Sequence, residues 1–237
     1  METTAIKTRG NAAKEAERAV VISEALQDAI VERRLPPGMK LVEAEIGSLF
    51  DVSRTIVRTA LQELSFLGLV RIERNRGAFV AKPSPEEARQ IFDARRLVEP
   101  GITMDAIKQA SNDDLAHLRK HLQHENEAMS QRGLSARRME IRASGDFHLL
   151  LASIAGNLIV QRFMSELIAR SCLVIALYGQ SGASSCGHDD HVEIVDAIAA
   201  RDAARAVALT QHHIDHLEAD LNYRSSDDIE LRQALSL

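Results

Sequence analysis

The sequence predicts a mainly α-helical protein in two parts, with its only strands in one small hairpin near the N-terminal end. Three observations support this class. Hydrophobic residues make up 45% of the 237 residues, but aromatic residues make up only 3% and Trp is absent, so the core must be aliphatic and rich in Ala. Such a composition favours helices over sheets. Apolar residues recur at helical spacing along most of the chain, whereas the alternation typical of a strand is confined to residues 70–80.

The first part should contain three helices followed by the hairpin. Its helices are expected over residues 17–34, 44–50 and 54–67, and its strands over residues 70–74 and 78–80. The segment Leu35-Pro36-Pro37-Gly38 ends the first helix, because a proline bars the α conformation to the residue before it. Ser53 is the expected N-cap of the third helix and Gly68 follows its end. Gly77 lies in the turn of the hairpin.

Every element predicted after residue 83 is a helix. Ser84-Pro85-Glu86-Glu87 is a typical helix start, with a Ser cap, Pro at the first position and Glu three residues after the cap. The expected helices cover residues 85–110, 112–132, 135–155, 158–178, 189–201 and 203–222. Pro100-Gly101 should kink the first of them, and the Gly- and Ser-rich loop 179–187 is the longest break. The predicted segments are a flexible arm (1–16), a first domain (17–82), a linker (83–85), a second domain (86–222) and a C-terminal tail (223–237).

Charge is distributed unequally between the two domains. The net charge is −5, but residues 1–82 hold 13 Lys and Arg against 11 Asp and Glu, whereas residues 83–237 hold 16 against 23. A local basic surface, rather than the total charge, determines affinity for DNA. The N-terminus has no apolar signal region, and no segment approaches the ~20 apolar residues of a membrane span. Because Cys172 and Cys186 form no disulfide or metal pattern, we expect a cytoplasmic protein with reduced thiols and no membrane contact.

The first domain has the element order of a winged helix-turn-helix: helix, short helix, tight turn, longer helix, hairpin. In such modules the start of the longer helix reaches base edges in the major groove. Arg54 and Arg58 share one face of that helix, and an Arg fork can bind guanine through two hydrogen bonds. Two arginines alone would indicate only a solvated face, but the order of elements and the basic hairpin loop favour DNA binding. The predicted DNA-contacting residues are Ser53, Arg54, Thr55, Arg58, Arg74, Arg76 and Gly77.

This domain also resembles the GntR family of bacterial regulators. The matching segments are Leu35-Pro36-Pro37-Gly38, Leu41, Val52-Ser53-Arg54-Thr55, Val57-Arg58, Ala60-Leu61, Leu64, Gly68-Leu69-Val70 and Arg76-Gly77-Ala78-Phe79-Val80. The resemblance implies that Arg54, Thr55 and Arg58 read the major groove, with Gly77 at the tip of the wing. Many members carry an Arg or Gln that touches DNA at the position of Ala44, so this chain lacks that contact.

The second domain is similar to the all-helical effector domain of the FadR-type subgroup, often called FCD. The similarity is carried by Arg95 and Glu99, Phe147-His148, Ala155-Gly156-Asn157, Asp190-His191 and His213. It implies a homodimer on a palindromic operator, repression relieved by a small organic-acid effector, and a divalent metal that binds a carboxylate of that effector. It also implies effector contacts from Arg95, Ser144 and Asn157. An i,i+4 ion pair with Glu99 is an equally open reading of Arg95.

The spacing of three histidines gives a separate argument for a metal. His191 lies ten residues before the turn expected at Arg201-Asp202, and His213 lies eleven residues after Asp202. In an antiparallel helix pair both would therefore sit ~15 Å from the turn. With His148 from a third helix they predict a site for Zn²⁺, or for Ni²⁺ or another borderline ion. An ordinary polar cluster is the alternative, and the other six histidines are expected at the surface: His117, His121, His124, His188, His212 and His216.

One ligand of the family pattern is missing from this chain. Relatives carry an Asp four residues before the first His, where this sequence has Ser144. Asp146 is two residues from His148 and points ~200° round the helix, so it cannot easily replace that ligand. We therefore expect a three-His site completed by water or by the effector.

A three-His site with an open position is also typical of catalytic zinc, so a metal-dependent hydrolase is the alternative function. The sequence has no H-E-x-x-H motif and no nucleophile motif. A hydrolase would have no use for a DNA-binding domain, and a purely structural DNA-binding protein would not need the acidic helical domain. The sequence therefore predicts a regulator of transcription that is not an enzyme.

Overall fold

The computed structural model of the chain describes residues 2–130, 134–179 and 185–223. The chain divides into two compact units, residues 1–82 with 165–173 and residues 83–164 with 174–237. The first unit carries the only sheet found in the described residues, and the second is built from helices. This confirms the predicted class, which is mainly helical with a winged helix-turn-helix before a helical bundle. None of the helices in these ranges is long and apolar enough to cross a membrane.

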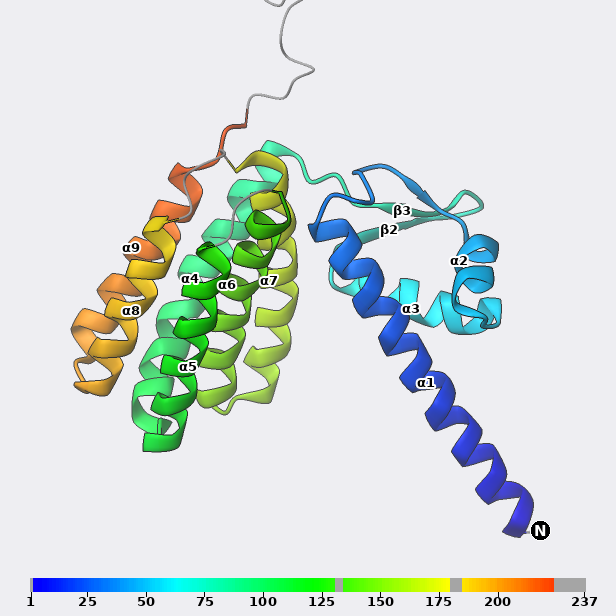
Figure 1. Cartoon of the computed structure of the whole chain (residues 1–237), viewed down its shortest axis with the longest axis horizontal. Coiled ribbons are helices and arrows are strands. Elements are labelled where there is room, and N and C mark those ends of the chain that lie inside the picture. The colour runs from blue at the N-terminus through cyan, green and yellow to red at the C-terminus, as the bar shows by residue number, and fades with distance from the viewer. Residues whose placement is uncertain (1, 131–133, 180–184, 224–237) are drawn as a thin grey trace, which may run out of the picture. The chain divides into compact units, whose positions relative to one another are not determined.

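The N-terminal unit is a three-helix module with a small antiparallel sheet (Figure 1). Its elements are α1 (Glu2–Val31), β1 (Lys40–Leu41), α2 (Glu43–Phe50), α3 (Arg54–Phe66), β2 (Val70–Glu73) and β3 (Gly77–Val80). Helices α1 and α2 pack on α3, and the strand order is β1-β3-β2. The apolar face of α3 is closed off from solvent, with Val57, Ala60 and Leu64 at 0% exposure. That packing leaves the opposite face of α3 to carry its polar residues.

Local signals fix the ends of α3 and the turn of the hairpin. The Ser53 hydroxyl accepts a hydrogen bond from the Ile56 N–H at 3.5 Å, which makes Ser53 the N-cap, as predicted. Gly68 follows the C-cap with φ +74°, and Gly77 has φ +100° at the start of β3. Both values lie in the left-handed region that favours glycine. Glu73 pairs with Gly77, which sets the register of the hairpin.

Two features of this unit differ from the prediction. Helix α1 begins at Glu2, whereas the polar arm was expected to extend to residue 16. The stretch from Ala12 to Ala16 is composed of Ala, Lys and Glu, which favour a helix even without an apolar stripe. The strand β1 was also missed, because two residues are too few to show an alternating pattern. It pairs Lys40 with Phe79 and Leu41 with Ala78.

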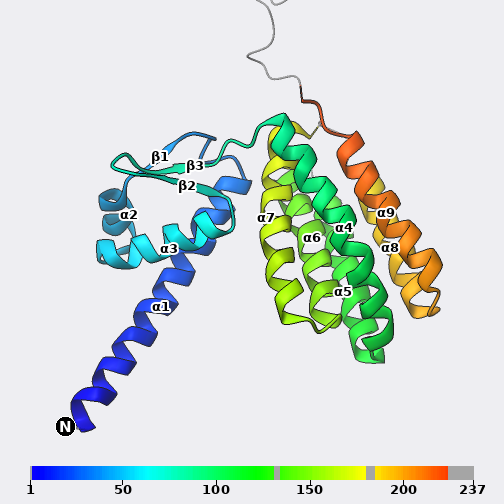
Figure 2. The same cartoon turned by 180° about the vertical axis from the view of Figure 1, so that it is seen from behind.

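The C-terminal unit consists of helices that stand side by side (Figures 1 and 2). They are α4 (Pro85–Gln109), α5 (Asn112–Met129), α6 (Leu134–Ile154), α7 (Leu158–Tyr178), α8 (Ser185–Ala199) and α9 (Ala203–Ala219), except that residues 165–173 of α7 group with the first unit. Helix α4 packs on α6 and α9, and α5 packs on α6 and α8. The Ser84 hydroxyl caps α4 as predicted, and α4 continues through Pro100 as one helix. Helix α8 begins at Ser185 rather than at residue 189, and residues 180–184 of the predicted loop lie outside the described residues.

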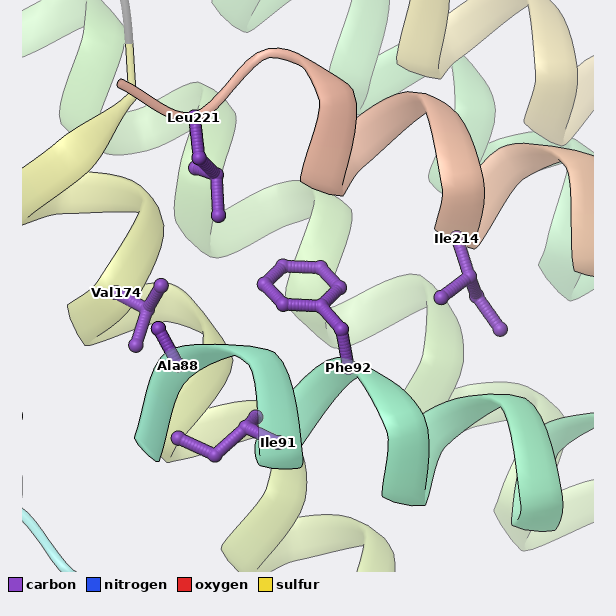
Figure 3. Close-up of a cluster of buried hydrophobic side chains, with 6 residues drawn as sticks. All are labelled: Ala88, Ile91, Phe92, Val174, Ile214 and Leu221. Carbon is purple, nitrogen blue, oxygen red and sulfur yellow. The ribbon is translucent and has the colours of Figure 1, made fainter. Parts of the chain in front are cut away.

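An apolar cluster holds α4, α7 and α9 together at one end of this unit (Figure 3). Phe92 lies at its centre, among side chains from all three segments: Ala88, Ile91, Val174, Ile214 and Leu221. The Phe92 side chain is completely buried. Burial of an aromatic side chain of this size contributes about 1.5–3 kcal/mol to folding. The cluster holds α9 against α4 and so fixes the position of the histidines of α9 relative to α4.

The turn between α8 and α9 lies where the sequence predicts it. Arg201 has φ +57°, and the Asp202 carboxylate accepts a hydrogen bond from the Arg205 N–H at 3.0 Å, so that Asp202 caps α9. The Arg201 guanidinium also donates to the carbonyl groups of Ile107 and Ala110 at the end of α4. These contacts tie the α8–α9 turn to α4 and bring His191 and His213 to the same level.

Candidate nucleic-acid interface and candidate metal centre

The start of α3 presents its polar side chains to solvent. Ser53, Arg54, Thr55 and Arg58 are all exposed, opposite the buried face of the helix. Among the residues that the structure describes, Arg54 has no ion-pair partner. The geometry is that of a helix whose first turn and a half can enter a groove of DNA. Ala44 is exposed in the first turn of α2, where it offers no polar group.

Arg58 is held by a residue that the sequence analysis missed. Its Nε donates to both carboxylate oxygens of Glu43, at 2.9 Å to Oε1 and 2.8 Å to Oε2. The contacts that Arg58 makes with described residues all involve Nε, which leaves both Nη groups for another acceptor. Glu43 is the first residue of α2 and lies 15 residues before Arg58. Only the packing of α2 on α3 brings the two together, so no local pattern could have indicated the pair.

The β2–β3 loop forms a basic wing. Arg76 forms an ion pair with Glu73, and its guanidinium lies 5.5 Å from the centroid of the Phe79 ring. The Nζ of Lys40 lies 6.0 Å from the centroid of the same ring, so β1 adds a cation that the sequence analysis missed. Against the single carboxylate of Glu73, the wing and its edge carry four basic side chains: Lys40, Arg71, Arg74 and Arg76.

Three histidines meet inside the C-terminal unit. His148 comes from α6, His191 from α8 and His213 from α9, and all three side chains are buried. The His213 Nε2 lies 3.2 Å from the His148 Nε2 and 3.1 Å from the His191 Nε2. The ligand atoms of this triad all lie within 4.8 Å of one another. The predicted convergence of these three residues is therefore confirmed.

The other ring nitrogen of each histidine faces a carboxylate. The Nδ1–carboxylate pairs are His148 with Glu99 Oε2 at 2.8 Å, His191 with Glu125 Oε1 at 3.0 Å and His213 with Asp190 Oδ2 at 3.2 Å. With the proton on Nδ1, each ring donates an Nδ1–H hydrogen bond to its carboxylate, which leaves the lone pair of Nε2 pointing inward. Carboxylates in this position behind metal-binding histidines orient the ring and raise its basicity. No sequence pattern indicated Glu125, which the packing of α5 on α8 brings beside His191.

Burial keeps the three imidazoles neutral. It lowers the pKa of His148 to about 4, although the Glu99 carboxylate opposes the shift. Burial also lowers the pKa of His213 to about 4 and that of His191 well below its usual range. Burial alone would raise the pKa of Glu99, but the Arg95 guanidinium and the His148 ring hold it well below its usual range. At neutral pH the site therefore offers three unprotonated nitrogens.

Arg95 borders the triad. Its Nε donates to Glu99 Oε1 at 2.5 Å, and its Nη2 lies 3.0 Å from the His148 Nε2. Both Arg95 and Glu99 are buried, at 1% and 3% exposure. The i,i+4 ion pair considered from the sequence is thus present, and it places a guanidinium beside the nitrogens of the triad.

The donor set fits a borderline divalent ion. Zn²⁺ binds imidazole nitrogen at about 2.0–2.1 Å in a tetrahedral arrangement, which separates two ligand nitrogens by about 3.3 Å. The two nitrogen–nitrogen distances at His213 are 3.2 and 3.1 Å. A cation placed between these nitrogens would be coordinated by all three lone pairs. Among the described residues, no carboxylate takes the place of the Asp that relatives carry four residues before the first His.

The remaining predicted positions are placed as follows. Ser144 is half-buried on α6, one turn before His148. Asp146 is exposed and lies 4.0 Å from the Arg142 Nε, which confirms that it points away from the triad. Asn157 is exposed, and its Oδ1 accepts hydrogen bonds from the Ile159 and Val160 N–H groups, so that it caps α7.

Two histidines expected at the surface are partly buried, and the prediction for them was wrong. The Nδ1 of His188 lies 3.2 Å from Glu125 Oε2, and the Nε2 of His121 lies 2.8 Å from the Ala143 carbonyl oxygen. Three histidines surround Glu125, with a ring nitrogen at 3.9 Å for His121, 3.2 Å for His188 and 3.0 Å for His191. Burial raises the pKa of Glu125, and the hydrogen bond with His188 opposes that shift. Contact with this buried carboxylate, which the sequence does not indicate, accounts for the partial burial of the two rings.

Comparison with known proteins gives the family. Residues 18–80 match the family described as bacterial regulatory proteins, gntR family, and residues 90–216 match the FCD domain. The chain belongs to the GntR family. Its effector-binding domain is an FCD domain, as in the FadR subgroup, and it is a transcriptional regulator. The alternative of a metal-dependent hydrolase is therefore set aside.

Relatives align over nearly the whole regulator. It is 28% identical to the Uxu operon transcriptional regulator of Escherichia coli, over 86% of this chain and 87% of the relative. It is 28% identical to the transcriptional repressor NanR of Edwardsiella tarda, over 88% of each chain. A solved structure of a GntR regulator from Rhodococcus sp. RHA1 superposes with a TM-score of 0.73, at 28% identity, over 86% of this chain and 96% of that one.

Proposed function

We propose that this regulator is a repressor that binds a palindromic operator as a homodimer and releases it when a small carboxylate effector binds at a divalent metal in the FCD domain. The observation that carries the proposal is the buried triad of His148, His191 and His213, with a carboxylate behind each ring. Repression is supported by the relatives named as repressors.

His148, His191 and His213 would hold the metal. A bound Zn²⁺ would supply a Lewis-acidic open position that takes an oxygen of the effector. The three carboxylates keep each Nε2 directed into the site, and burial of the rings excludes competing protons. The Arg95 guanidinium, next to the His148 Nε2, is placed to donate to the second oxygen of the same effector carboxylate. The pairing with Glu99 holds that guanidinium in position.

The DNA-reading residues would divide into two groups. Arg54, Thr55 and Arg58 at the start of α3 would contact base edges, and Ser53 would add a phosphate contact at the helix N-terminus. Glu43 holds Arg58 through Nε, so the guanidinium is oriented before it meets DNA. The wing residues Arg74, Arg76 and Gly77 would follow the phosphate backbone, joined by Lys40.

The proposal is tested by selecting genomic fragments that the full-length protein retains, and then measuring binding to the selected operator by fluorescence anisotropy. Zinc-loaded and chelator-stripped protein are compared, each with a panel of small mono- and dicarboxylates. We expect a palindromic site, and release by at least one carboxylate only from the zinc-loaded protein. Release that is equally strong from stripped protein would refute the role of the metal. Binding that shows no sequence preference at physiological salt would refute the operator.

A further inference from the structure

A second histidine cluster lies on the outside of the helical unit, next to the buried triad. His212 and His216 are one turn apart on α9, and Asp190 comes from α8; their ligand atoms all lie within 4.8 Å of one another. The centroids of the two imidazole rings are 4.2 Å apart. His212 is exposed, and the His216 side chain keeps 44% of its surface accessible. Ions in solution can therefore reach this group, which we call the outer cluster.

The ligand atoms of the outer cluster are available. Asp190 contacts described residues only through Oδ2, which lies 3.2 Å from the His213 Nδ1 and 3.3 Å from the His216 Nδ1, so that Oδ1 has no described partner. The only interaction of His212 with a described residue is the ring contact with His216. Two imidazoles and one carboxylate are a ligand set typical of Zn²⁺ sites that keep an open position.

We propose that Asp190, His212 and His216 form a second binding site for a borderline divalent cation such as Zn²⁺, separate from the buried triad. Helical geometry fixes the two histidines at i,i+4 on one face, so that both rings can turn toward one ion without a change in the backbone. The carboxylate arrives from the neighbouring helix, which is already held beside α9 by the short turn at Arg201-Asp202. The excess of acidic residues in this half of the chain favours a cation.

The two sites share one residue. Asp190 orients His213 of the triad and belongs to the outer cluster, so a change at Asp190 disturbs both sites. Changes at His212 and His216 remove neither a ligand of the triad nor a carboxylate behind one, since His216 reaches the triad only through Asp190 Oδ2, which it shares with His213. This difference allows the two sites to be told apart. His117 and His124 give a matched control, since both are exposed on α5 and neither belongs to a three-ligand group of described residues.

The experiment counts Zn²⁺ ions on untagged, chelator-stripped, full-length protein by native mass spectrometry, with stepwise affinities from calorimetric titration. We expect two ions per chain in the wild type and one in the double variant His212→Ala/His216→Ala. The control His117→Ala/His124→Ala should keep two, and Asp190→Asn should lose the outer ion and bind the inner one at least about tenfold more weakly. Equal thermal melts of the stripped wild type and double variant would show that the exposed substitutions leave the fold intact.

The outcomes separate this site from the proposed triad. If the wild type binds one ion and the double variant binds none, the outer site is supported and the metal in the triad is refuted. If the double variant keeps the full count and affinities of the wild type, the outer site is refuted, whatever the triad does. Absence of Zn²⁺ binding by the wild type would refute both.

Discussion

Replacing His213 by Ala should remove the part of the stability of the FCD domain that depends on zinc in the buried triad. The Nε2 of His213 is the vertex of the triad, at 3.2 Å from His148 and 3.1 Å from His191. Without it, two imidazoles on α6 and α8 remain, which is fewer than the three protein ligands typical of an open zinc site. His213 is fully buried, so the variant also loses packing. The informative quantity is therefore the shift in Tm caused by zinc, and not the Tm itself.

The expected size of that shift follows from linkage. A ligand that binds only the folded state stabilises it by about 2.7 kcal/mol at a free concentration 100 times its Kd. For a domain of this size 1 kcal/mol raises Tm by about 4 °C, so zinc should raise the Tm of the wild type by about 10 °C. In the His212→Ala/His216→Ala background, where the outer cluster cannot bind zinc, the further change His213→Ala should reduce the shift to less than about 2 °C, on the same scale.

Differential scanning calorimetry in chelator and then in buffered Zn²⁺ measures both shifts. His117→Ala removes an exposed histidine on α5 and should keep the wild-type response. A metal in the triad would be contradicted if the His212→Ala/His216→Ala protein melts at the same temperature in chelator and in zinc, or if adding His213→Ala to it leaves the zinc response unchanged. In either case the triad would be an ordinary buried polar cluster.

Three further outcomes are expected. Arg54→Ala should weaken the free energy of binding to the cognate operator by about 1–3 kcal/mol and relax the sequence preference, with an unchanged circular dichroism spectrum. Specific binding that survives both Arg54→Ala and Arg58→Ala would contradict the assignment of α3 as the DNA-reading helix. Sedimentation at micromolar concentration should give about twice the chain mass of 26.1 kDa, and a monomer that binds one half-site tightly would contradict the homodimer. Metal-free protein should lose stability as pH falls from about 6.5 toward 4, because the unfolded chain binds protons that the buried His148 and His213, each with a pKa of about 4, do not; a flat Tm across this range would contradict it.

Much of the fold could be predicted because its signals are local. Ser53 and Ser84 cap helices, and each precedes a segment whose apolar residues recur at helical spacing. The Arg201-Asp202 turn sets how far along α8 and α9 the two histidines lie. Strand β1 was missed because it has no local signal. A strand of two residues, Lys40–Leu41, shows no period and exists only through its pairing with β3.

The site was predictable in its ligands but not in their supports. The triad could be predicted because, in an antiparallel helix pair, the number of residues from the turn fixes the distance of each histidine from that turn. The carboxylates could not, because each reaches its histidine by the packing of separate helices: Glu125 lies 66 residues from His191 along the chain, and Glu99 lies on α4 while His148 lies on α6. The same packing partly buries His121 and His188. Sequence spacing thus predicts the histidines that meet in a helical site, and tertiary packing decides which carboxylates contact their Nδ1 atoms.

Restoring the Asp of the family pattern at Ser144 tests whether this position belongs to the metal site. Ser144 is half-buried on α6, one turn before His148, so an Asp at this position would share a face with His148. Ser144→Asp should tighten Zn²⁺ binding about tenfold or more, since it adds an anionic ligand to three neutral ones. The same carboxylate would occupy the position that the effector takes, so a carboxylate effector should release the operator less readily. Calorimetric titration with Zn²⁺ and anisotropy with the selected operator measure the two effects, and Ser144→Asn, which has the same shape without the charge, is the control. Tighter zinc binding with an unchanged effector response would show that the effector does not bind at the vacated position, and unchanged zinc binding would place Ser144 outside the metal site.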